Sequence, residues 1–215
     1  MLDSIVLYGS LILTVAGLVS LRRKRGVGMT IAGLVGVGAA LFWPAGEKRA
    51  TGATQLDRVM PVWEFDERHE VEIAATPERI FDAVRSVRAG DIRFFNTLTA
   101  IRRGGRKQRE NILNAGNDAP ILDVALRSGF FVLADDAPRE LVFGSYVIRP
   151  KRALAAMNFL VVPNGATSRL ITETRIHTTD DSARRRFAVY WRIIHPGSDI
   201  IRREWLAAIA RHSVR

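Results

Sequence analysis

The first 43 residues are mostly apolar and form two segments separated by a short basic cluster. Residues 2–21 contain a single charged residue, Asp3, residues 27–43 contain none, and Arg22-Arg23-Lys24-Arg25-Gly26 lies between them. At about 1.5 Å per residue, roughly 17 to 20 apolar residues cover most of a hydrocarbon core about 30 Å thick. The pattern therefore predicts a transmembrane helical hairpin over residues 1–43.

A cleaved secretory signal is the alternative for the first segment. Such a signal begins with basic residues, whereas here the basic cluster follows the apolar run, so we favour a retained anchor. The positive-inside rule places the turn in the cytoplasm and the domain that follows outside it, although Lys48 and Arg49 favour the opposite orientation. We expect an integral membrane protein of the cell membrane with two transmembrane helices and an extracytoplasmic soluble domain.

Small residues recur every four positions in the second apolar segment, at Gly28, Ala32, Gly36 and Ala40. This spacing predicts one helix face that a second helix can approach closely. The partner is either the first segment of the same chain, through Gly9, Ala16 and Gly17, or the same helix of another copy. We favour the first, because a short turn already holds the two segments together.

Residues 44–67 are predicted to be a linker, and residues 68–215 read as one α+β domain. Val71 and Ile73 alternate with glutamates, as in a half-buried strand. Thr76-Pro77-Glu78 is typical of a helix start, and further helices are expected from Asp91 and over about residues 119–127. Four strand-like runs then predict an antiparallel sheet, at residues 130–133, 140–148, 153–162 and 168–178.

A long amphipathic helix is predicted at the end of the chain. Apolar and aromatic residues are spaced by three and four from Phe187 to His212. Pro196-Gly197 interrupts this pattern, and proline usually kinks or breaks a helix. Because the apolar stripe keeps its phase across Pro196, we favour one kinked helix over two separate ones.

Composition excludes several kinds of site. The net charge is +10, and the chain has no cysteine and four histidines. Disulfides and thiolate chemistry are therefore excluded. The histidines show none of the paired spacings typical of metal sites, and His69 is expected to be exposed. We predict no metal, no cofactor and no catalytic group.

The chain resembles the START-like helix-grip superfamily, and more narrowly its polyketide cyclase/dehydrase and lipid-transport branch. The resemblance covers about residues 69–215 and is carried by VEIAATPERIFDAV, the helix after GDIRFF, SGFFVLADDAPRELVFGSY, TETRI and ARRRFAVYWRIIHPGSDIIRREWLAAI. It implies a curved antiparallel sheet around a long C-terminal helix, with an apolar cavity between them. The family name is not in itself evidence of cyclase activity.

A cavity of this kind would be lined by apolar and aromatic side chains with a few polar groups. The candidate ligand-binding residues are Phe143, Tyr146, Met157, Asn158, Phe159, Phe187, Trp191 and Ile194. Ordinary core packing is the alternative for each of them, and the pattern does not decide which side of each strand faces inward.

Two charged groupings have alternative interpretations. Glu173, Arg175 and His177 share one strand face and could form a catalytic cluster, but we favour a solvated outer face with Glu173 paired to Arg175. The basic segment, Arg102, Arg103, Arg106, Lys107 and Arg109, is either a solvated loop or a contact for anionic head groups at a membrane surface. Nucleic acid is disfavoured because no aromatic residues alternate with these arginines.

The sequence favours a membrane-anchored binding or transfer module for a lipid or other apolar small molecule. The alternative is a polyketide cyclase- or dehydratase-like enzyme that acts on an apolar substrate. The oligomeric state is left open.

Overall fold

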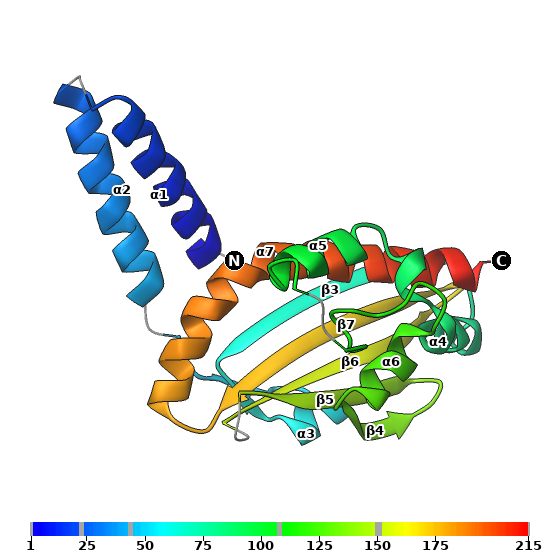
Figure 1. The fold of residues 1–215 in the computed structure, drawn as a ribbon. Coiled ribbons are helices and arrows are strands. Elements are labelled where there is room, and N and C mark those ends of the chain that lie inside the picture. The colour runs from blue at the N-terminus through cyan, green and yellow to red at the C-terminus, as the bar shows by residue number, and fades with distance from the viewer. Residues whose placement is uncertain (1, 22–23, 43–44, 107–108, 149–151, 215) are drawn as a thin grey trace. The chain divides into compact units, whose positions relative to one another are not determined.

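The computed structural model describes residues 2–21, 24–42, 45–106, 109–148 and 152–214, and the chain forms two compact units (Figure 1). The first unit contains Met1–Gly46 and Asp181–Pro196, and the second contains Glu47–Asp180 and Gly197–Arg215. The boundary within the last helix falls directly after Pro196, the residue that interrupts the helical pattern in the sequence.

Two antiparallel helices, α1 (Leu2–Val19) and α2 (Lys24–Phe42), form a hairpin in the first unit. A Cβ atom added to Gly33 would lie 2.3 Å from Thr14 Oγ1, and one added to Gly17 would lie 2.5 Å from Thr30 N. The helices therefore touch through glycine, as expected for contact within one chain.

The face that makes this contact agrees with the predicted one only at Gly36, where an added Cβ would lie 2.3 Å from Oγ of Ser10, and at the buried Ala40. Gly28 and Ala32 are exposed, whereas Gly26, Gly33 and Ala40 are buried. The three buried residues follow a seven-residue spacing, which keeps them on one side of the helix better than a strict repeat of four does. Large aliphatic side chains point away from the contact, among them Ile12 (71% exposed) and Val19 (83% exposed).

The predicted membrane span is not found. Within the described residues, no helix has both the length and the apolar character needed to cross a membrane. The prediction of an integral membrane protein with two transmembrane helices is therefore wrong. Asp3 lies in the first turn of α1 and α2 begins with Lys24 and Arg25, so each uninterrupted apolar stretch falls short of the roughly 20 residues that a spanning helix needs.

The second unit is built on an antiparallel five-stranded sheet in the order β3-β7-β6-β5-β4 (Figure 1). The strands agree with the predicted runs, and β3, the first in sequence, pairs with β7, the last, so that β3 and β4 form the two edges. Their bounds are β3 Phe65–Ile73, β4 Phe131–Asp136, β5 Glu140–Ile148, β6 Ala153–Asn164 and β7 Thr167–Thr178.

The helices of this region also follow the sequence pattern. They are α4 (Pro77–Ser86), a 3₁₀ turn (Ala89–Asp91), α5 (Phe95–Arg102), α6 (Ile121–Arg127) and α7 (Asp181–Ser213). Phe94 has a φ of 59° in the left-handed region, so α5 begins after it and not at Asp91. Pro196 lies inside α7, which continues as a single helix.

The larger hydrophobic core lies on one side of the sheet, called here the inner face. Directly opposed residues of neighbouring strands share a face, which places Leu141, Phe159 and Thr172 together. Phe159 packs edge-on against Trp205 of α7 with ring centroids 5.2 Å apart. This α+β arrangement of an antiparallel sheet and a long C-terminal helix fits a helix-grip fold.

The outer face of the sheet is covered by the segment predicted to be a linker. Residues 47–63 contain β1 (Lys48–Arg49), α3 (Gln55–Val59) and β2 (Val62–Trp63), and Leu56 packs with Val142 and Ala156 of the sheet. A capping box between Thr54 and Asp57 begins α3. The Thr-x-x-Asp pattern is a sequence signal that could have predicted this helix.

Candidate functional site

A cluster of polar side chains lies on the inner face where β3 meets α7. Glu67 and His69 are two residues apart on β3, so their side chains share a face. The Nε2 atom of His69 lies 3.0 Å from Oε1 of Glu67 and 3.5 Å from Oδ1 of Asp199 on α7. Ser198 donates a hydrogen bond of 2.7 Å to Oε2 of Glu67.

These residues are buried more than the sequence suggested. Glu67 is 6% exposed and His69 is 9% exposed, so the expectation that His69 lies on the surface is wrong. α7 covers this position, because Ser198 and Asp199 contact the same two side chains. Burial makes the polar contacts inside this cluster stronger than equivalent contacts in water.

A groove of about 490 Å³ borders the cluster along the edge of the sheet. Its lining consists of consecutive β3 residues and of α7 residues spaced by three and four: Arg68, His69, Glu70, Val71, Arg203, Leu206 and Ala207. The volume is in the usual range for small-molecule sites. The lining combines apolar side chains with two arginines, one glutamate and one histidine.

Two arginines of α7 lie beside the carboxylates of this region. Arg203 donates hydrogen bonds of 2.8 and 3.2 Å to the carboxylate of Asp199. Arg202 has a buried Nη1 atom that no described residue bonds. Burial lowers the pKa of Arg202 to about 10, against the attraction of Glu67, so the guanidinium stays protonated near neutral pH.

The structure separates the predicted ligand-binding residues into three groups. Phe143, Met157 and Phe159 lie on the inner face and are buried in the core. Tyr146 and Asn158 lie on the outer face, opposite Leu154 and Glu173 respectively. The other three belong to the part of α7 in the first unit, Phe187, Trp191 and Ile194. Their part in ligand binding stays a prediction.

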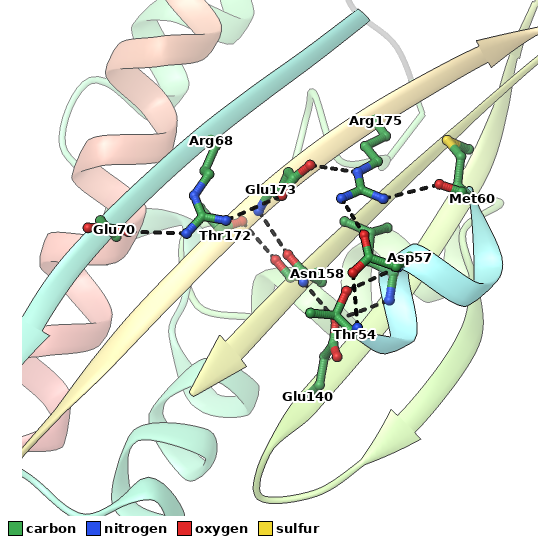
Figure 2. Close-up of polar contacts among 11 residues, drawn as sticks. Thr54, Asp57, Met60, Arg68, Glu70, Glu140, Asn158, Thr172, Glu173 and Arg175 are labelled. Carbon is green, nitrogen blue, oxygen red and sulfur yellow. Dashed lines mark hydrogen bonds and ion pairs between the residues drawn. The ribbon is translucent and has the colours of Figure 1, made fainter. Parts of the chain in front are cut away.

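Asn158 instead belongs to a polar network beneath α3, shown in Figure 2. Its amide donates a 2.7 Å hydrogen bond to Glu140, and its side-chain oxygen accepts one of 2.9 Å from the backbone of Glu173. Glu140 also accepts from the backbone nitrogens of Gln55 and Leu56. The buried glutamate thus caps the first turn of α3 and attaches it to the sheet.

Arg175 is the second centre of the network (Figure 2). Its guanidinium contacts Asp57 at 2.8 Å and Glu173 at 2.6 Å, and donates to the carbonyl oxygen of Met60 at 3.1 Å. It also lies 3.7 Å from the ring centroid of Trp63. The predicted pair of Glu173 and Arg175 is therefore present on the outer face.

The outer face is less solvated at this point than expected. Arg175 is 5% exposed because α3 and β2 cover it, while the side chain of His177 is 44% exposed and faces Glu64 at 3.4 Å. These contacts tie the covering segment to the sheet. Glu173, Arg175 and His177 do not line the groove, although Oε2 of Glu173 lies 3.6 Å from Nη1 of Arg68, which does.

Asp57 is ionised in this network. Burial alone would raise the pKa of its carboxyl group, but hydrogen bonds from Thr54 and from Arg175 outweigh that effect and lower it below its ordinary value. The negative charge of Asp57 is thus part of what holds Arg175 in place.

The basic segment follows α5. Arg102, Arg106 and Arg109 are exposed and Arg103 is half-buried, with Arg103 donating a 2.8 Å hydrogen bond to the carbonyl oxygen of Arg106. Lys107 lies outside the described residues. The exposed arginines are accessible to an anionic partner, and whether they bind one stays a prediction.

Comparison with known proteins gives no family assignment. No protein-family model matches the chain, and no curated protein matches it. Similar solved structures include protein MLL2253 from Mesorhizobium loti (13% identity, 69% of this chain and 96% of that chain, TM-score 0.39). They also include TTHA0849 from Thermus thermophilus (12%, 70% and 97%, TM-score 0.32) and Ara h 8.0201 (11%, 70% and 97%, TM-score 0.34). At these TM-scores the similarity supports no inference about function.

Proposed function

We propose that the second unit binds an amphipathic small molecule, such as a lipid with an anionic head group, in the groove between β3 and α7. The observation that carries this proposal is the groove itself, which has a volume of about 490 Å³ and a lining of mixed character. Ligand sites of this size combine an apolar wall with a few polar groups that fix orientation.

The lining suggests how such a molecule would lie. Val71, Leu206 and Ala207 offer an apolar surface for a hydrocarbon chain, while Arg203 can approach a carboxylate or phosphate. The side chain of Arg203 is 61% exposed and is held by Asp199 on the preceding turn of the helix. A guanidinium that is already oriented loses less entropy when it binds an anion.

Binding of a fluorescent fatty acid, with unlabelled oleate as competitor, tests this proposal. Filling the groove by Ala207→Phe should abolish saturable binding. Arg203→Gln should weaken binding of the acid about threefold to tenfold and leave binding of its neutral methyl ester unchanged. Arg184→Gln is the matched control, because Arg184 also pairs with an aspartate of α7, Asp181, and does not line the groove.

Two results would overturn the proposal. If the full-length chain binds neither the acid nor the ester, the groove is not a lipid site. If Ala207→Phe binds the probe as the natural chain does, the ligand lies elsewhere.

The alternative function is catalysis by a polyketide cyclase- or dehydratase-like enzyme. The residues considered for it, Glu173, Arg175 and His177, lie on the outer face and do not line the groove, and only Glu173 faces a lining residue, Arg68, at 3.6 Å. Mass analysis of a ligand recovered after incubation separates the two functions, because a binding module returns it with unchanged mass.

We also propose that the basic segment contacts an anionic membrane surface. Arg102, Arg106 and Arg109 are exposed, and each basic residue near such a surface contributes about 1 kcal/mol. A lipid-binding module could then exchange its ligand with the membrane.

A further inference from the structure

We propose that Glu67, His69 and Asp199 bind a first-row divalent metal ion such as Zn²⁺ or Mn²⁺ at the inner end of the groove. No pattern in the sequence predicted this site, because its ligands come from β3 and α7, which are more than one hundred residues apart. The proposal concerns a metal ion and does not depend on the amphipathic ligand.

The two distances from His69 to the carboxylates agree with coordination of one ion. Donor atoms about 2.1 Å from a tetrahedral or octahedral metal lie roughly 3.0–3.4 Å from one another. Nε2 of His69 lies 3.0 Å from Oε1 of Glu67 and 3.5 Å from Oδ1 of Asp199. Ligand atoms of the three residues all lie within 4.8 Å of one another, so an ion needs only small side-chain adjustments to enter.

The hydrogen-bonding capacity of the cluster also favours a metal ion. One imidazole nitrogen faces two carboxylates, and a single N–H cannot donate fully to both. A metal ion instead accepts an electron pair from all three groups at once. One imidazole and two carboxylates is a ligand set that suits Zn²⁺ and Mn²⁺.

The surroundings would hold the ligands in place. Ser198 donates to Oε2 of Glu67, which leaves Oε1 directed at His69, and supporting hydrogen bonds of this kind orient metal ligands. Glu67 and His69 are largely buried, which distinguishes them from an acidic surface patch. Because His69 also lines the groove, open coordination positions would face the groove and accept water or a ligand.

Two arginines close to the three ligands add positive charge that opposes metal binding. Arg203 makes its shorter hydrogen bond, 2.8 Å, to Oδ2 of Asp199 and a longer one, 3.2 Å, to Oδ1, so it can stay on Oδ2 when Oδ1 binds the ion. Arg202 attracts Glu67. Their positive charge weakens the site relative to one without arginines, and removing Arg203 should therefore strengthen metal binding.

Calorimetric titration of the tag-free, metal-stripped full-length chain with ZnCl₂ and MnCl₂ tests this site. We expect one saturable site for at least one of these ions. Asp199→Asn and His69→Ala should each weaken binding at least about tenfold, and Arg203→Gln should strengthen it. His212→Ala is the matched control, since His212 faces one carboxylate, Asp91, at 3.4 Å and belongs to no three-residue group in the described part of the chain.

Glu67→Gln keeps an acceptor for Ser198 and removes a metal ligand, so it separates loss of binding from loss of folding. Its circular dichroism should match that of the natural chain, and its melting temperature should no longer rise when metal is added. Absence of binding to both ions, or equal affinity in the natural chain and the three ligand variants, would overturn the proposal. Neither result would bear on fatty-acid binding, which is measured without metal.

Discussion

Replacing Asp57 by alanine should detach the covering segment from the outer face of the sheet. Asp57 and Arg175 form an ion pair of 2.8 Å in which both side chains are buried, with 8% and 7% exposed. Asp57 also accepts a 3.0 Å hydrogen bond from the backbone nitrogen of Thr54, which closes the first turn of α3. The substitution therefore removes a buried charge and half of a capping box.

The structure sets the size of the effect. Removing one partner of a buried ion pair costs about 3 to 5 kcal/mol when the other charge is left alone. Arg175 keeps Glu173 at 2.6 Å and the carbonyl oxygen of Met60, which lowers that cost, whereas the lost bond to Thr54 adds about 1 kcal/mol. We expect Asp57→Ala to lower the free energy of unfolding by about 3 kcal/mol.

Urea unfolding followed by tryptophan fluorescence measures this loss, and Trp63 reports on it locally because its ring lies on Arg175. Asp135→Ala is the control: Asp135 pairs with Arg85 at 2.7 Å, but the two side chains are 41% and 47% exposed. An exposed pair of this kind contributes at most about 1 kcal/mol. Equal losses in the two variants would refute the view that the covering segment is held by buried charge.

Three further predictions concern pH, the hairpin and the basic segment. The pKa of Asp57 is lowered in the folded chain, so its stabilising effect should be complete above about pH 4 and disappear as the pH falls further. The difference in unfolding free energy between the natural chain and Asp57→Asn should therefore shrink in acid. A difference that stays constant with pH would contradict this. In the hairpin, Ser10→Cys with Gly36→Cys should form a disulfide: a Cβ at Gly36 would lie 3.0 Å from that of Ser10, and a separation of the helices by about 0.5 Å brings the pair into the usual disulfide range of roughly 3.5–4.5 Å. Adding Gly33→Leu should suppress it, whereas Gly28→Leu, with no atom within 4 Å of the added Cβ, should not. In vesicle sedimentation, the double variant Arg102→Gln with Arg106→Gln should bind phosphatidylserine vesicles about tenfold or more weakly than the natural chain. Its binding to neutral vesicles should be unchanged. An equal loss of binding to both kinds of vesicle would argue against a head-group contact.

Most of the second unit could be predicted from the sequence, because local patterns specify it. Alternation along β3 and the regular spacing along α7 correctly predicted a strand and a helix. The order of the strands and the burial of His69 depend on contacts between distant segments, such as β3 with β7 and with α7. Single-sequence patterns do not contain that information.

The site was harder to predict than the fold. To predict which residues point to the inner face, one must know which face of each strand is buried. Met157 and Asn158 are adjacent in sequence and lie on opposite faces. Glu67 and His69 form a Glu-x-His pattern in the sequence, but the spacing between histidines does not reveal it. The third member, Asp199, could be identified only from the structure.

Photo-crosslinking tests most directly the claim that the groove binds an amphipathic ligand. A fatty acid with a diazirine near its tail would be irradiated with the full-length chain, and the modified peptides would be mapped by mass spectrometry. We predict that crosslinks fall on residues 68–71 of β3 and 203–207 of α7, that excess oleate removes them, and that they are absent in Ala207→Phe. Crosslinks that map instead to the outer face or to residues 187–194, and persist in Ala207→Phe, would contradict the proposed site.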